Sequence, residues 1–201
     1  MIGALHERLV HRSRVHRLAG AIADLLPDKA SVLDVGSGDG ALAQRLFELR
    51  PDVRIQGVDV LVREDTQFPV RVFDGRNIPD PDNSVDVVLL VDVLHHTDDP
   101  VVLLQEAKRV ARRVVVIKDH CRDGLLAGPT LRLMDWVGNA HHGVALPYNY
   151  WPRSRWLATF RDLKLDVEEW RSRLGLYSPP AGWVFDRSLH FLARLSARSG
   201  H

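Results

Sequence analysis

The sequence has very little cysteine, because Cys121 is the only one among 201 residues. A single thiol cannot close a disulfide within the chain, and it cannot build a zinc site from several cysteines. The sequence also lacks an excess of charge of either sign, since 27 basic and 26 acidic residues give a formal net charge of +1. Such a balance provides no general electrostatic reason to bind nucleic acid or an anionic membrane. We therefore expect neither as a partner.

Long hydrophobic runs are missing as well. Runs such as 85–91 contain aspartate and are far too short to span a bilayer. Residues 1–8 have no long apolar stretch behind their basic side chains, so we expect no secretory signal and a cytoplasmic protein. A chain of this length suits one domain, which we place at 1–201 and expect as a monomer or homodimer.

From residue 31 onward, short apolar runs alternate with helical patterns. Strands are expected at 31–35, 54–60, 70–73, 85–91 and 114–118, and helices at 41–49 and 100–111. Strands that are apolar almost throughout are typical of a parallel sheet buried on both faces. Their alternation with helices, joined by right-handed crossovers, predicts a three-layer, doubly wound α/β fold.

Two segments lie outside this alternation. The first is 1–28, where apolar spacing over residues 4–26 predicts an amphipathic helix that lies over the domain or its active site. The basic face of this helix is either solvated or attracts an acidic substrate. Residues 119–151 are rich in Gly, His and aromatic residues, with one helix expected at 125–137. A long irregular segment inside a compact domain is usually functional, so we expect a cap there.

The segment Gly36-Ser37-Gly38-Asp39-Gly40 follows the first expected strand and opens into a helix. Glycines allow a sharp turn and a close approach of backbone to ligand, and a helix N-terminus offers unpaired N–H groups. The pattern alone is weak. It also fits a dinucleotide-binding turn, or a tight turn with no ligand at all.

Carboxylates help to choose between these ligands. Asp34 lies just before the glycines, where it would repel a pyrophosphate but attract the amino group of a sulfonium amino acid. Asp59 ends the second expected strand, where a carboxylate accepts from ribose hydroxyls, and Asp74 follows the third, where it accepts from an adenine amino group. Each alone could be a solvated turn residue, whereas three on one rim of one sheet favour a nucleoside-bearing, cationic ligand.

At this point the sequence resembles the class I S-adenosylmethionine-dependent methyltransferases, particularly the small-molecule group (methyltransferase type 11) that includes ubiquinone-biosynthesis-type enzymes. The resemblance covers about 31–118. It is carried by motif segments at 32–40 (Val-Leu-Asp-Val-Gly-Ser-Gly-Asp-Gly), 57–60 (Gly-Val-Asp-Val), 73–75 (Phe-Asp-Gly), 78–86 and 90–100, the last ending in His-Thr-Asp-Asp-Pro.

The resemblance implies a Rossmann-like sheet of seven strands whose last strand is antiparallel, and 165–170 and 190–195 supply the sixth and seventh strands. It implies S-adenosylmethionine as cofactor and S-adenosylhomocysteine as product. It implies three groups of cofactor contacts. The methionine part is held by Asp34, Gly36, Ser37 and Gly38, and the ribose and adenine by Asp59, Val60, Asp74 and Gly75. The residues near the sulfonium are Val91, Asp92 and His95.

Methyl transfer from a sulfonium mainly requires alignment of acceptor, methyl and sulfur, with a base only where the nucleophile must lose a proton. Asp119 and His120 follow the fifth expected strand and are the candidates for this task, because an imidazole titrates near neutral pH. The alternative is that Asp119 caps the next segment and His120 lies on the surface.

The scheme requires no metal. His95, His96, Asp98 and Asp99 are metal-ligating residue types, but neighbours within one turn rarely converge on an ion, so we expect none.

The cap combines aromatic walls with polar tips, which suits a small organic methyl acceptor as well as ordinary packing. The candidate acceptor-binding residues are Trp136, Asn139, His142, Tyr148 and Tyr150. The leading hypothesis is therefore a methyltransferase for a small O, N or C nucleophile. A catalytically silent cofactor-binding subunit that supports a partner protein, and a nicotinamide-dependent oxidoreductase, are the alternatives.

Overall fold

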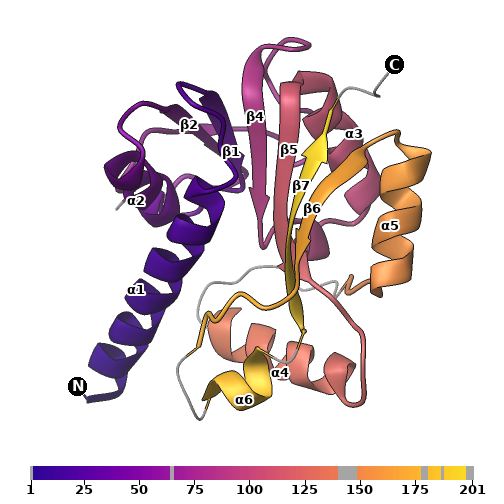
Figure 1. Cartoon of the computed structure of the whole chain (residues 1–201). Coiled ribbons are helices and arrows are strands. Elements are labelled where there is room, and N and C mark those ends of the chain that lie inside the picture. Colours follow the sequence, from indigo (N-terminus) through magenta and orange to yellow (C-terminus); the bar gives the residue numbers. More distant parts are fainter. Residues whose placement is uncertain (1, 64–65, 140–148, 178–180, 187, 198–201) are drawn as a thin grey trace.

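The computed structural model describes residues 2–63, 66–139, 149–177, 181–186 and 188–197. Within them, one seven-stranded sheet has the order β3-β2-β1-β4-β5-β7-β6 (Figure 1). The strands are β1 Ser31–Val35, β2 Arg54–Asp59, β3 Val70–Val72, β4 Val85–Val91, β5 Ala111–His120, β6 Asp166–Arg171 and β7 His190–Ser196. β7 pairs antiparallel with β5 and β6, and the other pairs are parallel. The predicted seven-stranded α/β sheet with an antiparallel last strand is confirmed.

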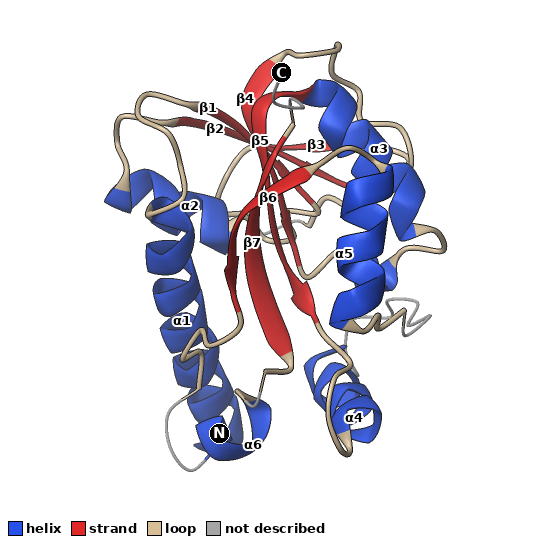
Figure 2. Cartoon of the chain, turned by 45° about the vertical axis from the view of Figure 1, so that its right-hand side comes forward, coloured by secondary structure: helices blue, strands red, loops and turns tan. Residues whose placement is uncertain are grey.

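Helices cover both faces of the sheet and one of its ends. One face carries α1 and α2, and the other carries α3 and α5 (Figure 2). The N-terminal part of α1, together with α4 and α6, lies beyond the carboxyl ends of the parallel strands (Figure 1). The bounds are α1 Ile2–Ala23, α2 Ala41–Leu49, α3 Pro100–Val110, α4 Ala127–Asn139, α5 Arg153–Asp162 and α6 Ala181–Phe185, with a 3-10 turn η1 at Leu94–His96. No helix among the described residues is both long and apolar enough to cross a bilayer.

β4 shows why its sequence is apolar at consecutive positions. Val87 and Leu89 belong to the hydrophobic cluster beneath α1 and α2, whereas Val88 and Leu90 belong to the cluster beneath α3 and α5. Successive side chains of a strand point to opposite faces, so a central strand buried on both faces needs apolar residues throughout. This strand separates two complete cores.

β1 lies at the point where the strand order reverses, with β2 on one side and β4 on the other. Open α/β sheets bind ligands in the crevice outside the carboxyl ends of their strands at such a point. The fold therefore directs attention to the residues that follow β1, β2 and β4.

β5 differs from the prediction in a way that matters for the site. It continues to His120 instead of ending at Lys118, because β7 supplies hydrogen-bonding partners for its last residues, with Asp119 opposite Phe191 and His120 opposite His190. Asp119 and His120 were predicted to follow the strand and instead lie inside it. The short α6 within 171–187 was not predicted.

Candidate functional site: the glycine loop

The loop after β1 takes a conformation that only glycine adopts easily. Gly36, Gly38 and Gly40 have φ of 76°, 59° and 75°, in the left-handed region. At Gly36 a Cβ would lie 2.3 Å from Cγ2 of Val93, so the loop is in close contact with the segment after β4. The backbone N–H groups of Gly36 and Ser37 both donate to the Val58 carbonyl, at 2.7 and 3.2 Å. The loop is thus fixed between the ends of β2 and β4.

Asp59, the last residue of β2, holds the same loop. Its Oδ2 accepts from the Gly38 N–H at 2.8 Å, and its Oδ1 accepts from the Leu61 N–H at 3.1 Å. A carboxylate has about four lone-pair sites, so each oxygen retains capacity for a further donor such as a ribose hydroxyl. Gly57 permits this arrangement, because a Cβ there would lie 2.6 Å from the Ser37 Oγ.

Asp34 is a buried acid directly below the loop. It is 1% exposed, and its Oδ2 has no hydrogen-bond partner within the part of the chain that the structure describes. Burial, together with the nearby charge of Asp59, raises the pKa of Asp34 to about 7. An unpaired carboxyl oxygen at this depth fits a ligand that brings a cationic N–H donor, as the amino group of S-adenosylmethionine would.

Asp74 and Gly75 lie beside the end of β2, as the sequence predicts. A Cβ on Gly75 would lie 3.0 Å from Cγ1 of Val60, which is 59% exposed. The Asp74 carboxylate closes its own turn by accepting from the side chain and N–H of Asn77 and from the N–H of Arg76, and these bonds lower its pKa to about 2. The exposed Val60 side chain next to this turn offers an apolar surface to a planar base.

Candidate functional site: the polar cluster

A second group of polar side chains gathers where β4, β5 and β7 meet. Charged and imidazole groups contact one another there at hydrogen-bond or ring-contact distance. We call this group the polar cluster, and its members are Arg14, Asp92, His95, Lys118, Asp119, His120 and His190. Three of these, Arg14, Lys118 and His190, were not among the predicted site residues.

Asp92 is the anion on the α1 side of the cluster. It accepts from Arg14 of α1 at 2.6 Å and from Lys118, whose side chain is fully buried. Burial acts to raise the pKa of Asp92, but the charges of Lys118 and Arg14 hold it well below its usual range. The helix expected to lie over the active site therefore reaches the residue predicted to lie beneath the sulfonium.

Asp119 is the anion on the opposite face of β5. Its Oδ1 is 2.7 Å from His95 Nδ1, and its Oδ2 accepts from the Leu94 N–H at 3.0 Å. Burial acts to raise the pKa of Asp119, and the neighbouring His95 and His120 keep it below its ordinary value. Asp119 thus anchors η1 and does not cap the following segment.

His120 is buried, so the alternative that it lies on the surface is wrong. Its Nδ1 is 3.3 Å from His95 Nδ1. Burial and the proximity of His95 lower its pKa to about 4, which makes it a neutral imidazole at neutral pH. Tyr150 closes this side, with its ring centroid 5.7 Å from that of His120 and its hydroxyl donating to the Leu131 carbonyl at 3.3 Å.

The structure does not describe the side chains of the remaining predicted acceptor-binding residues. Trp136 and Asn139 belong to α4, at positions whose side chains the structure does not describe, and His142 and Tyr148 lie outside the described residues.

Possible metal ligands converge differently from the prediction. Asp92, His95 and His120 each bring one ligand atom within 4.8 Å of the others, although His120 is distant from the other two in the sequence. Lys118 and Arg14 already neutralise Asp92, and two fixed cations disfavour a metal ion beside them.

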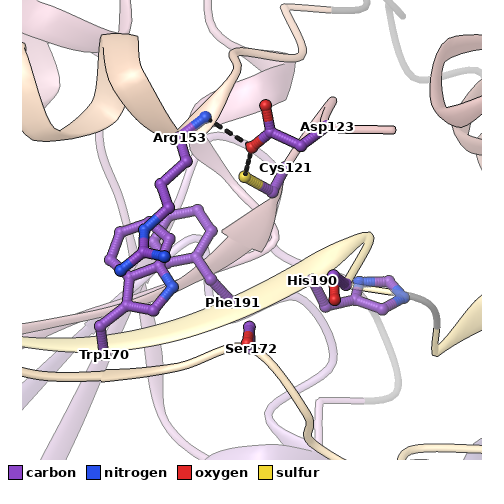
Figure 3. Close-up of a pocket in the computed structure, with 8 residues that line it drawn as sticks. Cys121, Asp123, Arg153, Trp170, Ser172, His190 and Phe191 are labelled. Atoms are coloured by element: carbon purple, nitrogen blue, oxygen red, sulfur yellow. Dashed lines mark hydrogen bonds between the residues drawn. The ribbon is translucent and has the colours of Figure 1, made fainter. Parts of the chain in front are cut away.

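A pocket of about 350 Å³ borders the polar cluster, because His190 is among the residues that line it. Its wall includes Trp170, Phe191 and Cys121, and the Cys121 thiol donates to Asp123 (Figure 3). The imidazole of His190 points away from these residues (Figure 3). The pocket contains no residue of the glycine loop, so it is separate from the predicted cofactor site.

Comparison with known proteins supports the donor side of this site. Residues 33–115 match a family described as a methyltransferase domain. A 27-O-demethylrifamycin SV methyltransferase of Amycolatopsis mediterranei (strain S699) is 30% identical over 111 residues, which are 48% of this chain and 40% of that protein. The chain thus spans about two fifths of the length of this curated relative.

Solved structures share the fold over most of the chain. A methyltransferase in complex with the Haloferax volcanii Trm112 methyltransferase activator has a TM-score of 0.69 at 19% identity, covering 90% of this chain and 89% of that chain. A Thermotoga maritima S-adenosylmethionine-dependent methyltransferase, described as a possible histamine N-methyltransferase, has a TM-score of 0.67 at 20% identity, covering 97% and 95%. The predicted resemblance to the class I methyltransferases is confirmed, and it implies use of S-adenosylmethionine.

Proposed function

We propose that this chain transfers a methyl group from S-adenosylmethionine to a small organic acceptor, because residues 33–115 match a methyltransferase domain. The observation that carries the proposal is the combination of the left-handed glycine loop with the unpaired Oδ2 of Asp34 below it. Together they provide backbone room for a ligand and an anion for its amino group.

The proposed cofactor site follows the carboxyl ends of three neighbouring strands. Asp34 and Gly36 to Gly38 hold the methionine part, Asp59 takes the ribose, and Val60 with Asp74 and Gly75 takes the adenine. When bound, S-adenosylmethionine supplies a methyl group on a sulfonium, which is a good leaving group. The chain's own contribution is then to align the acceptor with that methyl group, and alignment is worth several kcal/mol or more in such reactions.

Where the acceptor must lose a proton, we assign the role of general base to the group formed by Asp119, His95 and His120. Asp119 accepts from Nδ1 of His95, which sets the tautomer whose basic nitrogen is Nε2. His120 is buried and neutral at neutral pH, so it has an unprotonated nitrogen that can accept a proton. His120→Ala should leave cofactor binding intact and slow methyl transfer, and unchanged turnover would remove His120 from the reaction.

The acceptor is proposed to lie between the glycine loop, α1 and the residues before α5. Tyr150 supports this placement, because it is buried against both His95 and His120. Trp136, Asn139, His142 and Tyr148 remain predictions for the same role, as do the cytoplasmic location, the lack of nucleic-acid partners and the monomeric or homodimeric state.

A second candidate function is a silent cofactor-binding subunit that supports a partner protein. The observation in its favour is the fold shared with a methyltransferase that was solved together with an activator protein. A chain of this kind would bind the cofactor and release no methylated product without its partner.

Calorimetry and a transfer assay test both proposals. We expect S-adenosylmethionine and S-adenosylhomocysteine to bind with measurable heat and NAD to show none. Tight NAD binding alone would overturn the methyltransferase proposal in favour of a nicotinamide-dependent oxidoreductase. Methyl release from labelled S-adenosylmethionine onto a panel of small O, N and C nucleophiles separates the active enzyme from the silent subunit.

A further inference from the structure

His190 is the buried imidazole that starts β7. It lies opposite His120 in the antiparallel register, so both side chains point to the same face of the sheet. The ring centroids of the two histidines are 4.9 Å apart, and His190 is 2% exposed. This is the α1 face, on which Lys118 meets Asp92.

Lys118 determines which nitrogen of His190 carries the proton. The ammonium of Lys118 is 3.2 Å from His190 Nδ1. A lysine ammonium has three donors and no acceptor, so Nδ1 must be the accepting nitrogen. Burial, with Lys118 and His120 nearby, also holds the pKa of His190 well below its usual range, so the ring is neutral. The single remaining proton is therefore on Nε2.

The resulting Nε2–H donor has no partner. Within the described ranges, no hydrogen-bond acceptor is in reach of this buried atom. Other buried donors near the end of β5 are paired, such as the Trp156 indole N–H, which donates to the His120 carbonyl at 3.1 Å. Leaving a buried donor unsatisfied is costly, and such exceptions often mark a place where a ligand supplies the missing partner.

We propose that His190 Nε2–H binds an oxygen atom of the methyl acceptor, namely a carbonyl, carboxylate or phenolate oxygen. This subsite rests on the proposed function, because it assigns the acceptor side of the same site. Its surroundings favour a hydrogen-bond acceptor, since the polar neighbour of the ring, Lys118, is itself a donor.

The tautomer is testable on the unmodified chain. In protein labelled with ¹⁵N-histidine, NMR should show His190 with a protonated Nε2 and an unprotonated Nδ1 at neutral pH. Addition of benzoate or acetophenone to the complex with S-adenosylhomocysteine should shift the Nε2–H resonance, whereas benzylamine and toluene should not. A protonated Nδ1, or no shift with either oxygen-bearing probe, would overturn the proposal.

Two substitutions separate the donor from the acceptor of the ring. In His190→Gln the amide N–H occupies the place of Nε2–H, whereas in His190→Asn the amide oxygen reaches only the place of Nδ1 and remains available to Lys118. We expect His190→Asn to weaken benzoate binding about tenfold, which is the scale of one lost hydrogen bond to a charged group, and His190→Gln to retain most of it.

Benzoate binding to His190→Asn at the affinity of the unmodified chain contradicts the proposal. S-adenosylhomocysteine affinity, measured in parallel by calorimetry, should be the same in both variants. If the unmodified chain does not bind S-adenosylhomocysteine, the result counts against the proposed function instead. The two failures are thus distinguishable.

Discussion

The two halves of the sheet's carboxyl edge handle charge in opposite ways. Over β1, β2 and β3, Asp34 has a carboxyl oxygen with no hydrogen-bond partner among the described residues, and Asp59 accepts from backbone N–H groups. Both carboxylates can accept further hydrogen bonds from a ligand. In the polar cluster over β4, β5 and β7, Asp92 and Asp119 are instead matched with cations or imidazoles of the chain itself.

This difference indicates a division of labour. The first half is prepared for a ligand that brings positive charge and many hydrogen-bond donors. The second half is already neutralised and rigid, so it resembles a preorganised environment in which few polar atoms remain for the ligand to satisfy. Among the described residues, His190 Nε2 is one such polar atom there, as Asp34 Oδ2 is below the glycine loop.

The largest expected effect breaks the polar cluster. Lys118→Met removes the buried cation and leaves Asp92 with Arg14 alone, so we expect a loss of about 3–5 kcal/mol in the free energy of unfolding. Urea unfolding measures it. Lys118→Met combined with Asp92→Asn should recover much of the loss, and Arg14→Ala should cost only about 1 kcal/mol because that pair is partly exposed. If Lys118→Met alone stays within about 1 kcal/mol of the parent, the role given to Lys118 is wrong.

The next effect breaks the glycine loop. Gly36→Ala combines a left-handed backbone with a Cβ that would meet Val93, and we expect about 3 kcal/mol of destabilisation with loss of cofactor binding. Gly38→Ala is the matched control, because it has the same kind of φ and no atom within 4 Å of its Cβ, and it should cost about 1–2 kcal/mol. Equal costs for the two variants would mean that contact with Val93 does not constrain the loop.

The same contrast explains what the sequence could predict. The glycine loop is a local pattern in which a strand, three glycines and a helix follow within ten residues, and its acids lie where the chain leaves successive strands. Parallel strands bring such ends to one edge without further information. The fold could therefore be predicted, and so could the placement of Asp34, Asp59 and Gly75 at one edge of the sheet.

The polar cluster could not be predicted in the same way. Lys118 stands in an otherwise apolar strand, which was a signal for an unusual burial. Its partner His190 and the second cation on Asp92, Arg14, however, come from opposite ends of the chain. The end of β5 was misplaced because Asp119 and His120 interrupt the apolar pattern, whereas pairing with β7 keeps them in the strand. Contacts across 70 residues or more leave no local periodicity.

A smaller effect concerns cofactor affinity alone. Asp59→Ala should weaken S-adenosylhomocysteine binding by about 1.5–3 kcal/mol, the scale of hydrogen bonds to a charged group, because it removes the proposed ribose acceptor and releases Gly38. The affinity is measured by calorimetry, with Asp52→Ala as the control, because Asp52 is an exposed carboxylate that pairs with Arg50 before β2. The control should bind as the parent does, and equal affinity in Asp59→Ala would show the ribose assignment to be wrong.

The smallest effect is a pH dependence that originates at Asp34. Its pKa of about 7 lies above the ordinary value of 3.8, so the free chain holds this proton at pH values where an unfolded chain has lost it. Stability from this group is therefore present at low pH and is lost as pH rises from about 4 to about 7. Asp34→Asn should remove that part of the decline in thermal stability.

Cofactor binding should show the opposite trend with pH. The ligand's ammonium favours the ionised carboxylate, so binding to the protonated form must release a proton, and affinity should rise with pH and level off above about 7. We expect S-adenosylhomocysteine to bind about tenfold more weakly at pH 6 than at pH 8, and only about twofold more weakly at pH 7. Calorimetry in two buffers of different ionisation heat would detect the released proton. Asp34→Asn should bind S-adenosylhomocysteine more weakly at pH 8, and its affinity should not change with pH. If the affinity of this variant still rose with pH, the released proton would come from another group, because a side-chain amide cannot supply it.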